Sequence, residues 1–496
     1  MTNKKHLIIV GFGPVASYKY SRCIKSAIEQ GVISSYSIVD LETQRDTVLA
    51  RIKGLPAQPD GIFFLPNSDG FTVEDGINHF DSVCRDIVNK TGSSIKVIIS
   101  TEAQAHEAYL DYCISNGFDS LTTKPILLPM KEGLFDPISM NERMQSLVSK
   151  AKERPANHAV LCLGRYHEVY NEGVEAQILE KMSALQVPIT SINFKTSSGV
   201  WNLENEFLDR EDHPYKYGYG MLMHGAYHYI DLVAQFLTYN KLIYPDMNFG
   251  LDVVTFSAYP KDQSIRIPAN VTKLLSDFEK CKSAPVELDG KFGETDVVST
   301  FRLFDADTNQ TLTLGSLTLE QTTPGMRSWG PFHEVPYNIN GRLHCTDLDV
   351  RLATIFAANA HVIKTPIGGR QGPTDLRGRN SGRITVRSNI EVTGDQEFHT
   401  EQSIHRPYGN SFSYSAEYAV FNDWLCGKQT RSSLESHLAS VALLQALAES
   451  QKHSGEKITI DYNYQPRVGV IDLVKNKIDK VSLNERGNPI FAAYAP

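Results

Sequence analysis

The stretch LIIVGFGPVA, residues 7–16, decides the fold class and is the starting point for the rest of the chain. Its first four residues form an unbroken apolar run, which predicts a buried β-strand over residues 7–10. A turn with two glycines follows at once, and helical spacing then predicts a helix over residues 15–30 that ends at Gly31. A strand, a tight turn and a helix in this order begin a βαβ unit, so a parallel sheet is expected.

The same alternation of strand and helix continues outward from this stretch to about residue 130. Strands are predicted over residues 36–39, 61–65, 95–100 and 120–123, with helices over residues 44–53, 73–89 and 103–116. Helices on both faces of a parallel sheet explain unbroken apolar runs such as VIIS in residues 97–100. We therefore predict an α/β protein whose residues 1–130 form a Rossmann domain, a doubly wound parallel sheet.

The pattern changes after residue 130, where strand signals come to dominate. Strands are predicted over residues 159–163, 189–196, 253–259, 296–304, 311–319 and 383–392, and helices over residues 174–185, 415–425 and 432–450. Residues 327–382 are rich in glycine, proline and arginine and have weak periodicity, so a long loop is predicted there. These signals predict a larger α+β domain over residues 131–496 with a mostly antiparallel open sheet and insertions near residues 240–295 and 327–410.

Composition narrows the class of protein further. The chain has 496 residues, 41% of them apolar and 21% charged, with a net charge of −8. This balance excludes wholesale disorder and argues against a general binder of nucleic acid or of anionic membranes. No apolar run approaches the ~20 residues that span a bilayer. The seven cysteines are scattered without a C-x-x-C pair, so we expect no metal site, no disulfide framework and a cytoplasmic location.

The turn after the first strand matches the pattern G-x-G-x-x-G/A of dinucleotide-binding loops. The matching residues are Gly11, Phe12, Gly13, Pro14, Val15 and Ala16. The first glycine permits the tight turn, and the second lets a pyrophosphate approach the backbone at the positive end of the helix. Asp40 ends the second predicted strand, where a carboxylate accepts hydrogen bonds from the ribose of NAD and repels the 2′-phosphate of NADP. NAD is the predicted cofactor; nearby Arg45 keeps NADP open, and a glycine turn without any ligand is the alternative.

Motifs further along the chain resemble the Gfo/Idh/MocA family of oxidoreductases, which includes glucose–fructose oxidoreductase and inositol dehydrogenase. Matching positions in the first domain are Thr101, His106, Lys124 and Pro125, although Glu102 replaces the family's usual proline and Thr123 its usual glutamate. The segment of residues 220–231, GMLMHGAYHYID, is similar to the family's G-x-L-x-D-x-G-x-H-x-x-D. The resemblance extends over roughly residues 5–237 and 410–462.

The resemblance implies hydride transfer between a nicotinamide and a hydroxyl-bearing or keto carbon of a carbohydrate, cyclitol or aminosugar. It places Thr101, His106, Lys124 and Pro125 at the cofactor. Lys124 would also hydrogen-bond the reacting alcohol, since a lysine beside a cationic ring loses its proton more readily. A solvated lysine is the other interpretation. By the same resemblance, His228 would act as the general acid/base.

His224 stands where the family usually has aspartate, and it lies four residues before His228. Both imidazoles share one face if the segment is helical. His224 then contacts the substrate, or marks a reaction that has shifted or been lost, or is a core histidine. A zinc pair is not predicted, because Gly225 occupies the glutamate position of H-E-x-x-H and no third ligand is evident.

Further substrate contacts are expected by family analogy from Arg165, Tyr166, Trp201 and Tyr217. The family also commonly associates through its open sheet, so a homodimer or homotetramer formed by the C-terminal sheet is expected. Two other functions stay open: a non-catalytic sensor that binds the cofactor and signals through a partner, and a redox-neutral glycosidase or epimerase that uses NAD. The missing aspartate and glutamate motivate the sensor.

Overall fold

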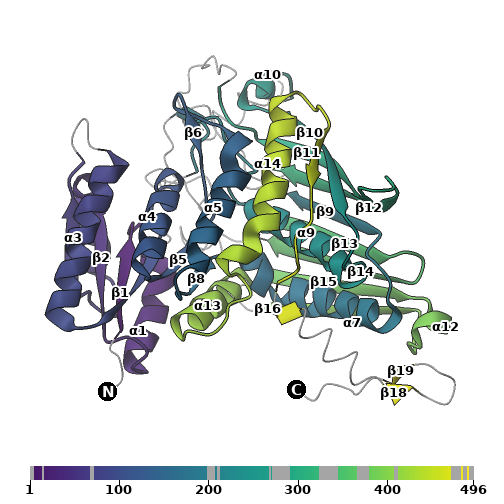
Figure 1. The fold of residues 1–496 in the computed structure, drawn as a ribbon, viewed down its shortest axis with the longest axis horizontal. Coiled ribbons are helices and arrows are strands. Elements are labelled where there is room, and N and C mark those ends of the chain that lie inside the picture. Colours follow the sequence, from purple (N-terminus) through teal and green to yellow (C-terminus); the bar gives the residue numbers. More distant parts are fainter. Residues whose placement is uncertain are drawn as a thin grey trace. The chain divides into compact units, whose positions relative to one another are not determined.

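The structure is a computed structural model that describes residues 5–13, 16–67, 72–197, 207–208, 213–266, 270, 291–322, 344–365, 379–406, 412–467, 469–470, 482–483 and 489–490. The chain forms two compact units (Figure 1). Unit 1 consists of Met1–Lys131, Asp136–Tyr166 and Ser413–Leu438, and unit 2 of Glu132–Phe135, His167–Phe412 and Ala439–Pro496. Unit 1 thus draws on three stretches of the chain, whereas the sequence suggested one boundary near residue 130.

Unit 1 is built on a six-stranded sheet in the order β3-β2-β1-β4-β5-β8, and every neighbouring pair is parallel. Its strands are β1 (Lys5–Val10), β2 (Ser35–Leu41), β3 (Gly61–Leu65), β4 (Ser94–Ile99), β5 (Asp119–Thr122) and β8 (His158–Val160). This order places the strand that carries the glycine turn in the interior of the sheet, between β2 and β4. The predicted Rossmann-type doubly wound sheet is confirmed.

Helices cover both faces of this sheet. The first group packs in a common core with β1 and β2 and consists of α1 (Ser21–Glu29), α2 (Arg45–Ile52) and α13 (Phe412–Leu425). The second group consists of α3 (Val73–Thr91), α4 (Ala103–Asn116) and α5 (Met140–Lys152). In this group α3 packs against α4, and α4 packs against α5. Because both faces are covered, adjacent strand residues such as Ile98 and Ile99 are both 0% exposed.

Two segments that the sequence assigned to the second domain lie in unit 1. The strand predicted over residues 159–163 is β8, which pairs with β5 at the edge of the parallel sheet. Its continuous apolar run suits a parallel strand covered on both faces. Helix α13 is the other segment, and it is fastened by Lys96, whose Nζ lies 4.8 Å from the Trp424 ring centroid and 2.5 Å from Asp119 Oδ2.

Unit 2 is built on a nine-stranded sheet in the order β16-β15-β14-β13-β9-β12-β11-β10-β17. The strands are β9 (Ser191–Ser197), β10 (Phe249–Ala258), β11 (Asp296–Asp305), β12 (Thr311–Glu320), β13 (His344–Leu352), β14 (Phe356–Thr365), β15 (Arg379–Ser388), β16 (His399–Arg406) and β17 (Ile458–Asp461). Only the pair of β9 and β12 is parallel among these strands, so the predicted mostly antiparallel sheet is confirmed.

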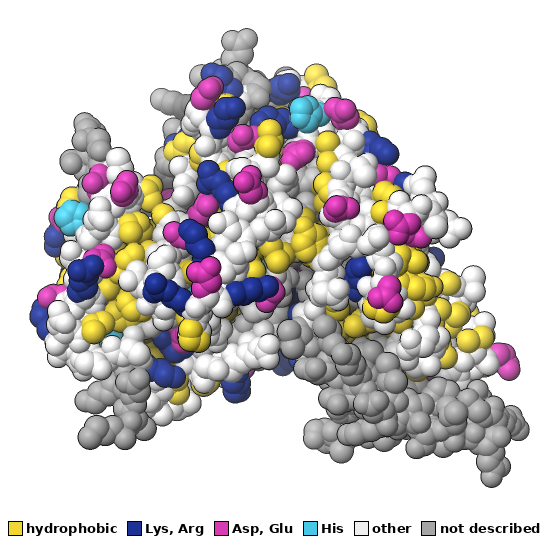
Figure 2. Space-filling model, in the orientation of Figure 1, with side chains coloured by type: hydrophobic (Ala, Val, Ile, Leu, Met, Phe, Trp, Pro, Cys, Tyr) yellow, Lys and Arg dark blue, Asp and Glu magenta, His cyan; other side chains and the backbone are white. Residues whose placement is uncertain are grey.

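One face of this sheet packs against helices α7 (Ala176–Leu185), α9 (Tyr227–Tyr239) and α14 (Leu438–Lys452) (Figure 1). Strand β13 shows the consequence, because Leu348 and Val350 are 0% exposed while the alternate residues Asp347 and Asp349 are half-buried. We call the side of the sheet that carries Asp347 the open face. Figure 2 shows acidic and basic side chains interspersed on the side of the molecule that it presents.

The prediction of a long loop over residues 327–382 is wrong for residues 379–382, which begin β15, and for residues 344–365. Strands β13 and β14 form an antiparallel pair there, with Asp347 opposite His361. The run DLDVRL of residues 347–352 alternates polar and apolar residues, a strand signal that the prediction overlooked, and the inward residues Ala358 and Ala360 give β14 only a weak apolar pattern. Strand β16 was likewise not predicted, and most of its residues are exposed.

Shorter elements complete the described chain. They are β6 (Met130–Lys131), β7 (Leu134–Phe135), α6 (Glu168–Tyr170), α10 (Gln263–Arg266), α12 (Ile390–Thr393), β18 (Ser482–Leu483), β19 (Pro489–Ile490), two π-helical segments (Ala16–Tyr20 and Asn171–Glu175) and six 3-10 segments (Glu42–Gln44, Pro137–Ser139, Leu163–Tyr166, Asn240–Leu242, Pro260–Asp262 and Leu434–His437). None of the helices in the described ranges is long and apolar enough to cross a membrane.

Candidate functional site

The glycine turn after β1 lies close to the loop that follows β4. Gly11 has φ +81° and its N–H donates to the Val39 carbonyl at 2.9 Å. A Cβ at this position would lie 2.5 Å from the Ser100 carbonyl oxygen, so only glycine fits. A Cβ on Gly13 would meet no heavy atom within 4 Å. The backbone at Gly13 is therefore open to approach, as the second glycine of a dinucleotide loop requires; Pro14 and Val15 lie outside the described residues.

Asp40 in β2 is tied to this turn. Its Oδ2 accepts a hydrogen bond from the Phe12 N–H at 2.7 Å, and its Oδ1 accepts one from the Leu41 N–H at 2.7 Å. An ionised carboxylate has about four acceptor positions, so hydrogen-bonding capacity is left for ribose hydroxyls. The predicted partners Phe12 and Asp40 are thus brought together.

An arginine that the sequence analysis missed lies beside them. Arg51, in the last turn of α2, donates from Nη1 to the Phe12 carbonyl at 3.0 Å. Burial lowers the pKa of Arg51, and the nearby charge of Asp40 partly opposes that shift. Arg45 is the residue that left NADP possible as the cofactor. It pairs with Glu42 (Nε to Oε1 2.5 Å), and its guanidinium lies 4.2 Å from the Phe64 ring centroid. No local pattern marks Arg51, since it is one of several charged residues on a predicted helix.

His106 in α4 joins the ends of β4 and β5. Its Nδ1 lies 2.6 Å from the Pro125 carbonyl oxygen, and its Nε2 lies 3.0 Å from the Thr101 carbonyl oxygen and 3.1 Å from Thr123 Oγ1. The ring is 2% exposed, and burial lowers its pKa. His106 therefore acts as an internal tie between the predicted residues Thr101 and Pro125, and both ring nitrogens are occupied by protein partners.

Lys124 follows β5, is half-buried, and precedes Pro125 across a cis peptide bond. Gly11, Asp40, Thr101 and Lys124 come at or just after the carboxyl ends of β1, β2, β4 and β5, respectively. In a parallel sheet these ends lie along one edge, where ligands of open α/β folds bind. The structure therefore brings the predicted cofactor residues of unit 1 to one edge of the sheet.

Arg165 and Tyr166 have internal roles in unit 1. The Arg165 guanidinium is buried and donates to the carbonyls of Arg431 and Ser436, each at 2.9 Å, and to Ser436 Oγ. Tyr166 Oη accepts from the Arg431 N–H at 2.8 Å, and burial raises the pKa of Tyr166 to about 12. Both side chains fasten the segment that precedes α14, and these contacts give no support to the predicted substrate contact.

The two histidines predicted for the site, His224 and His228, do not lie on the same helix. His228 lies in the first turn of α9 and is half-buried, whereas His224 lies in the turns before that helix. His224 is 7% exposed, its Nε2 lies 3.1 Å from the Pro214 carbonyl oxygen, and its ring contacts Tyr215 and Tyr219 edge-on at 4.9 and 5.5 Å. The condition for placing both imidazoles on one helical face is not met, and the surroundings of His224 are largely aromatic.

A buried carboxyl that the sequence analysis missed supports this turn. Glu294 is 3% exposed; its Oε1 accepts from the Leu222 N–H at 2.7 Å and its Oε2 from Gln451 Nε2 at 3.2 Å. Burial raises the pKa of Glu294. A Cβ on Gly220 would lie 2.1 Å from the Glu294 carbonyl oxygen, so the two backbones are in direct contact. Glu294 comes from the predicted insertion, where no motif marked it.

Two predicted substrate residues remain. Tyr217 is half-buried, and its ring stacks on Tyr219 with centroids 6.5 Å apart. Trp201 lies outside the described residues. Asp231 in α9 is fully buried and accepts from Ser440 Oγ at 2.6 Å, a structural contact.

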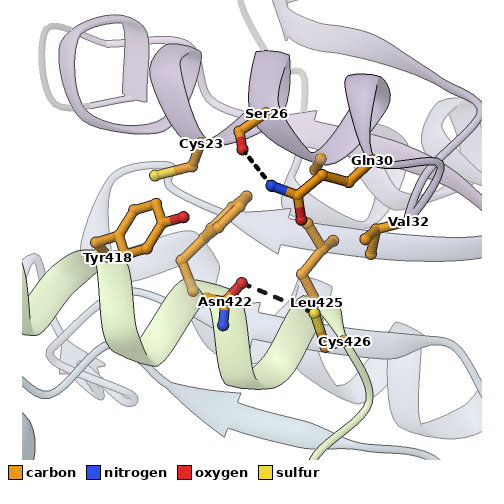
Figure 3. A pocket seen from close by; sticks show the side chains of 10 residues that line it. Cys23, Ser26, Gln30, Val32, Tyr418, Asn422, Leu425 and Cys426 are labelled. Atoms are coloured by element: carbon orange, nitrogen blue, oxygen red, sulfur yellow. Dashed lines mark hydrogen bonds between the residues drawn. The ribbon is translucent and has the colours of Figure 1, made fainter.

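A small pocket lies within unit 1 between α1 and α13 (Figure 3). Side chains of Cys23, Ser26 and Gln30 face those of Tyr418 and Asn422 across it. Burial raises the pKa of the Cys23 thiol to about 11, so this thiol is protonated at neutral pH. No charged side chain lines the pocket, and it supplies no group for the predicted chemistry.

Comparison with known proteins bears on the fold. No family model and no curated protein matches the sequence. An oxidoreductase from Agrobacterium radiobacter, solved with NAD+, L-tartaric acid and magnesium, is similar in structure with 14% identity, a TM-score of 0.51, and coverage of 93% of this chain and 99% of that one. A levoglucosan dehydrogenase in complex with NADH and levoglucosan has 12% identity, a TM-score of 0.53, and coverage of 92% and 99%.

A 3-ketoreductase from Actinomadura kijaniata, solved with NADP, has 11% identity, a TM-score of 0.50, and coverage of 90% and 98%. The likeness to all three proteins extends over nearly the whole of each chain. At these identities the likeness establishes a shared fold, that of oxidoreductases crystallised with nicotinamide cofactors.

Proposed function

We propose that this protein is an NAD(P)-dependent oxidoreductase that transfers a hydride between a nicotinamide and a CH–OH or keto carbon of a carbohydrate, cyclitol or aminosugar. The observation that carries the proposal is the glycine turn at the carboxyl edge of the parallel sheet, with Asp40 bound to the Phe12 N–H. The shared fold with sugar and nicotinamide oxidoreductases supports it. The proposal also assigns the chain to the Gfo/Idh/MocA type, which its motifs resemble.

In this proposal the residues of unit 1 hold the cofactor. The open backbone at Gly13 admits the pyrophosphate, and the free acceptor positions of Asp40 bind ribose hydroxyls. A 2′-phosphate would meet the negative charge of Asp40, so NAD is favoured over NADP. The positively charged Arg51 lies beside the same loop, so the preference for NAD over NADP should be measured with both cofactors.

When bound, the nicotinamide supplies the acceptor for the hydride. Lys124 hydrogen-bonds the substrate oxygen and orients the alcohol, and His228 accepts the hydroxyl proton and passes it to solvent. In the reverse direction His228 returns the proton as the carbonyl is reduced. Tyr217 and His224 contact the sugar-like substrate in this scheme. Glu294 holds the turn that carries His224 and acts as a positioning residue.

The test follows the near-ultraviolet absorbance of the reduced nicotinamide with a panel of sugars, cyclitols and aminosugars. We expect turnover by the wild type and a loss of about 10²–10⁴-fold in kcat for Lys124→Ala and His228→Ala. Lys131→Ala and His399→Ala, at exposed positions, serve as matched controls. Full turnover in both of the first two variants would overturn the assigned roles.

The same experiment separates the two other functions. Tight NADH binding without turnover on the panel, together with a co-purifying protein, favours the sensor, and the replacement of aspartate by the enclosed His224 is the observation behind it. Release of product without net change in NADH favours a redox-neutral reaction. Cytoplasmic location stays a prediction.

We also propose that the chain forms a homodimer or homotetramer through the open face of unit 2. Exposed apolar side chains there are Leu314 and Val298, with exposed fractions of 57% and 49%. Sedimentation should show a larger assembly for the wild type than for Leu314→Asp if this face is the interface.

A further inference from the structure

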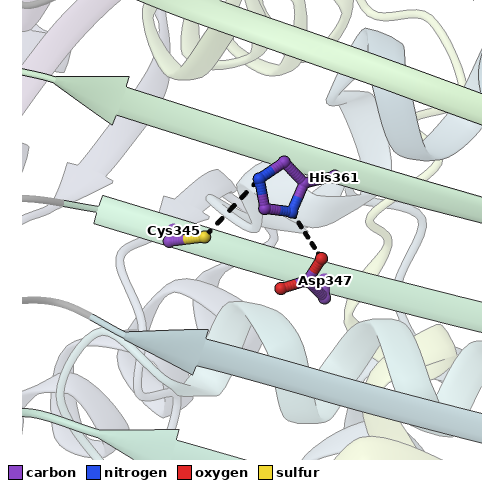
Figure 4. Close-up of side chains that lie close together, drawn as sticks. All are labelled: Cys345, Asp347 and His361. Atoms are coloured by element: carbon purple, nitrogen blue, oxygen red, sulfur yellow. Dashed lines mark hydrogen bonds and ion pairs between the residues drawn. The ribbon is translucent and has the colours of Figure 1, made fainter.

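Three donor side chains meet on the open face of unit 2, among residues that the proposed reaction does not use. Cys345 and Asp347 belong to β13 and His361 to the neighbouring β14 (Figure 4). One potential ligand atom from each lies within 4.8 Å of the others, and all three residues are half-buried. We call these three residues the open-face cluster.

Strand pairing fixes this arrangement. Asp347 and His361 are direct partners in the antiparallel pair, and Cys345 lies two residues before Asp347 on the same face. His361 Nδ1 is 2.5 Å from Asp347 Oδ1, and His361 Nε2 is 3.8 Å from Cys345 Sγ. The imidazole therefore lies between the thiol and the carboxyl, with one ring nitrogen turned to each (Figure 4).

This geometry is close to that of a histidine that binds a metal. Such a histidine commonly donates its second ring N–H to a carboxylate, as Nδ1 is placed to do here. Zinc lies about 2.3 Å from a thiolate sulfur and about 2.0–2.1 Å from an imidazole nitrogen, which at a tetrahedral angle separates sulfur and nitrogen by about 3.5–3.6 Å. The observed 3.8 Å needs a shift of only a few tenths of an ångström.

The charges also suit a divalent cation. Thiolate and carboxylate together carry two negative charges, which balance a 2+ ion. Lys195 lies opposite Asp347 on β9, but its Nζ pairs with Glu320 Oε2 at 3.1 Å. A second basic residue, Arg383, lies opposite His361 on β15, but it is exposed, so solvent screens its charge.

A cysteine nucleophile is the competing interpretation of a Cys–His–Asp group. A nucleophilic cysteine needs a thiolate at neutral pH. The 3.8 Å separation of Cys345 Sγ from His361 Nε2 is longer than the about 2.6–3.2 Å hydrogen bond of a base that activates a nucleophile, and it is close to the about 3.5–3.6 Å separation of two zinc ligands, which favours the metal site.

We propose that the open-face cluster binds a divalent ion of the zinc class, with Cys345 Sγ and His361 Nε2 as ligands and Asp347 as the carboxylate that orients the imidazole. Binding breaks the S–H bond and forms a metal–sulfur bond, and the proton passes to solvent. Water completes the coordination. The sequence predicted no metal site because the donors lie 16 residues apart along the chain and only the pairing of β13 and β14 unites them.

The experiment uses the full chain stripped with a chelator and then titrated with Co²⁺, followed by Zn²⁺. We expect one equivalent of Co²⁺ to produce sulfur-to-cobalt charge-transfer absorption that Zn²⁺ abolishes. Cys345→Ser should remove this band and His361→Gln should weaken binding at least tenfold. Asp347→Asn should weaken it by about 10–100-fold without removing the band.

Cys426→Ser and His405→Gln are matched controls, since both residues are exposed and lie outside the cluster. Both should bind Co²⁺ as the wild type does. Zn²⁺ should also raise the Tm of the wild type but not of Cys345→Ser, which guards against a folding defect in the variant. Retention of the band in Cys345→Ser, or no band in the wild type with rapid alkylation of Cys345 near pH 6, would overturn the proposal.

Discussion

The two sheets of this protein differ in what covers them, and that difference decides how much of each is visible in the sequence. In unit 1 the strands are covered on both faces, so neighbouring residues such as Ile98 and Ile99 are both fully buried. In unit 2 one face packs on helices and the other is open, so Leu317 is 1% exposed while Leu314 in the same strand is 57% exposed. The first sheet buries apolar side chains at consecutive positions of its central strands, whereas the second buries them mainly at alternate positions.

The functional proposals follow the same division. The edge of the covered sheet presents the backbone of Gly11 and Gly13 and the fixed side chain of Asp40, which suit the proposed cofactor. The open face of the second sheet can carry polar side chains along whole strands, and Cys345, Asp347 and His361 meet there by strand pairing alone. Each sheet thus offers a different way of assembling a site.

The largest effect should come from core truncations that test the difference directly. Ile98→Ala and Ile99→Ala should each lower the free energy of unfolding by about 2–5 kcal/mol, because both faces of β4 are packed. In β12, Leu317→Ala should cost a similar amount, whereas Leu314→Ala should change it by less than about 0.5 kcal/mol. Urea unfolding measures all four. A small cost for either isoleucine, or a large cost for Leu314 in the monomer, would contradict the proposed difference between the sheets.

The sequence predicted unit 1 well because its signals are local. The elements at residues 61–65 and 103–116 agree with β3 and α4 at both ends. Strands β13 and β14 escaped prediction because the segments around them are rich in glycine and proline and because inward residues of β14 such as Ala358 and Ala360 give a weak apolar pattern. The return of α13 to unit 1 also depends on a contact between distant segments, that of Lys96 with Trp424, which no local pattern encodes.

The site shows the same limit. Gly11, Phe12 and Asp40 were found because the turn and the strand end have fixed sequence positions, and the structure joins Phe12 to Asp40. Arg51 and Glu294 were missed because their importance comes from the backbone groups that they reach, Phe12 O and Leu222 N. Arg165 was predicted to bind substrate, but a buried guanidinium bound to three groups of the 431–436 segment is a packing contact.

The next prediction compares two glycines at the edge of the first sheet, one in a strained backbone conformation with close neighbours and one that faces open space. Gly11→Ala should destabilise the protein by about 2–4 kcal/mol, because the φ of +81° is strained for alanine and its Cβ would overlap the Ser100 backbone. Gly13→Ala should leave the urea unfolding midpoint nearly unchanged, since its Cβ enters open space.

If Gly13 faces the cofactor, the same alanine should weaken NADH binding at least tenfold, measured by fluorescence titration. Unchanged NADH affinity in a folded Gly13→Ala protein would argue against a pyrophosphate at this turn. Unchanged stability in Gly11→Ala would argue against the close approach of the turn to Ser100.

The smallest effect comes from buried histidines, one in each unit. Burial lowers the pKa of His158 in unit 1 to about 4 and that of His167 in unit 2 to about 3. Both imidazoles are therefore neutral in the folded protein at pH values where the unfolded chain, with a histidine pKa of about 6.5, takes up a proton. Their contribution to stability is complete above about pH 6.5 and is lost as the pH falls toward the folded-state values, by about 1–3 kcal/mol for each histidine.

Substitution of one histidine should flatten this pH dependence only in its own unit. His158→Gln keeps a partner for Ser120 Oγ, which lies 2.9 Å from His158 Nδ1, and should reduce the stability difference between pH 7 and pH 4.5 in the transition of unit 1. His167→Gln should do the same in the transition of unit 2. Separate transitions, each flattened by its own variant, would show that the two sheets are independent folding units. A single transition affected equally by both variants would show that the units unfold together despite their different cores.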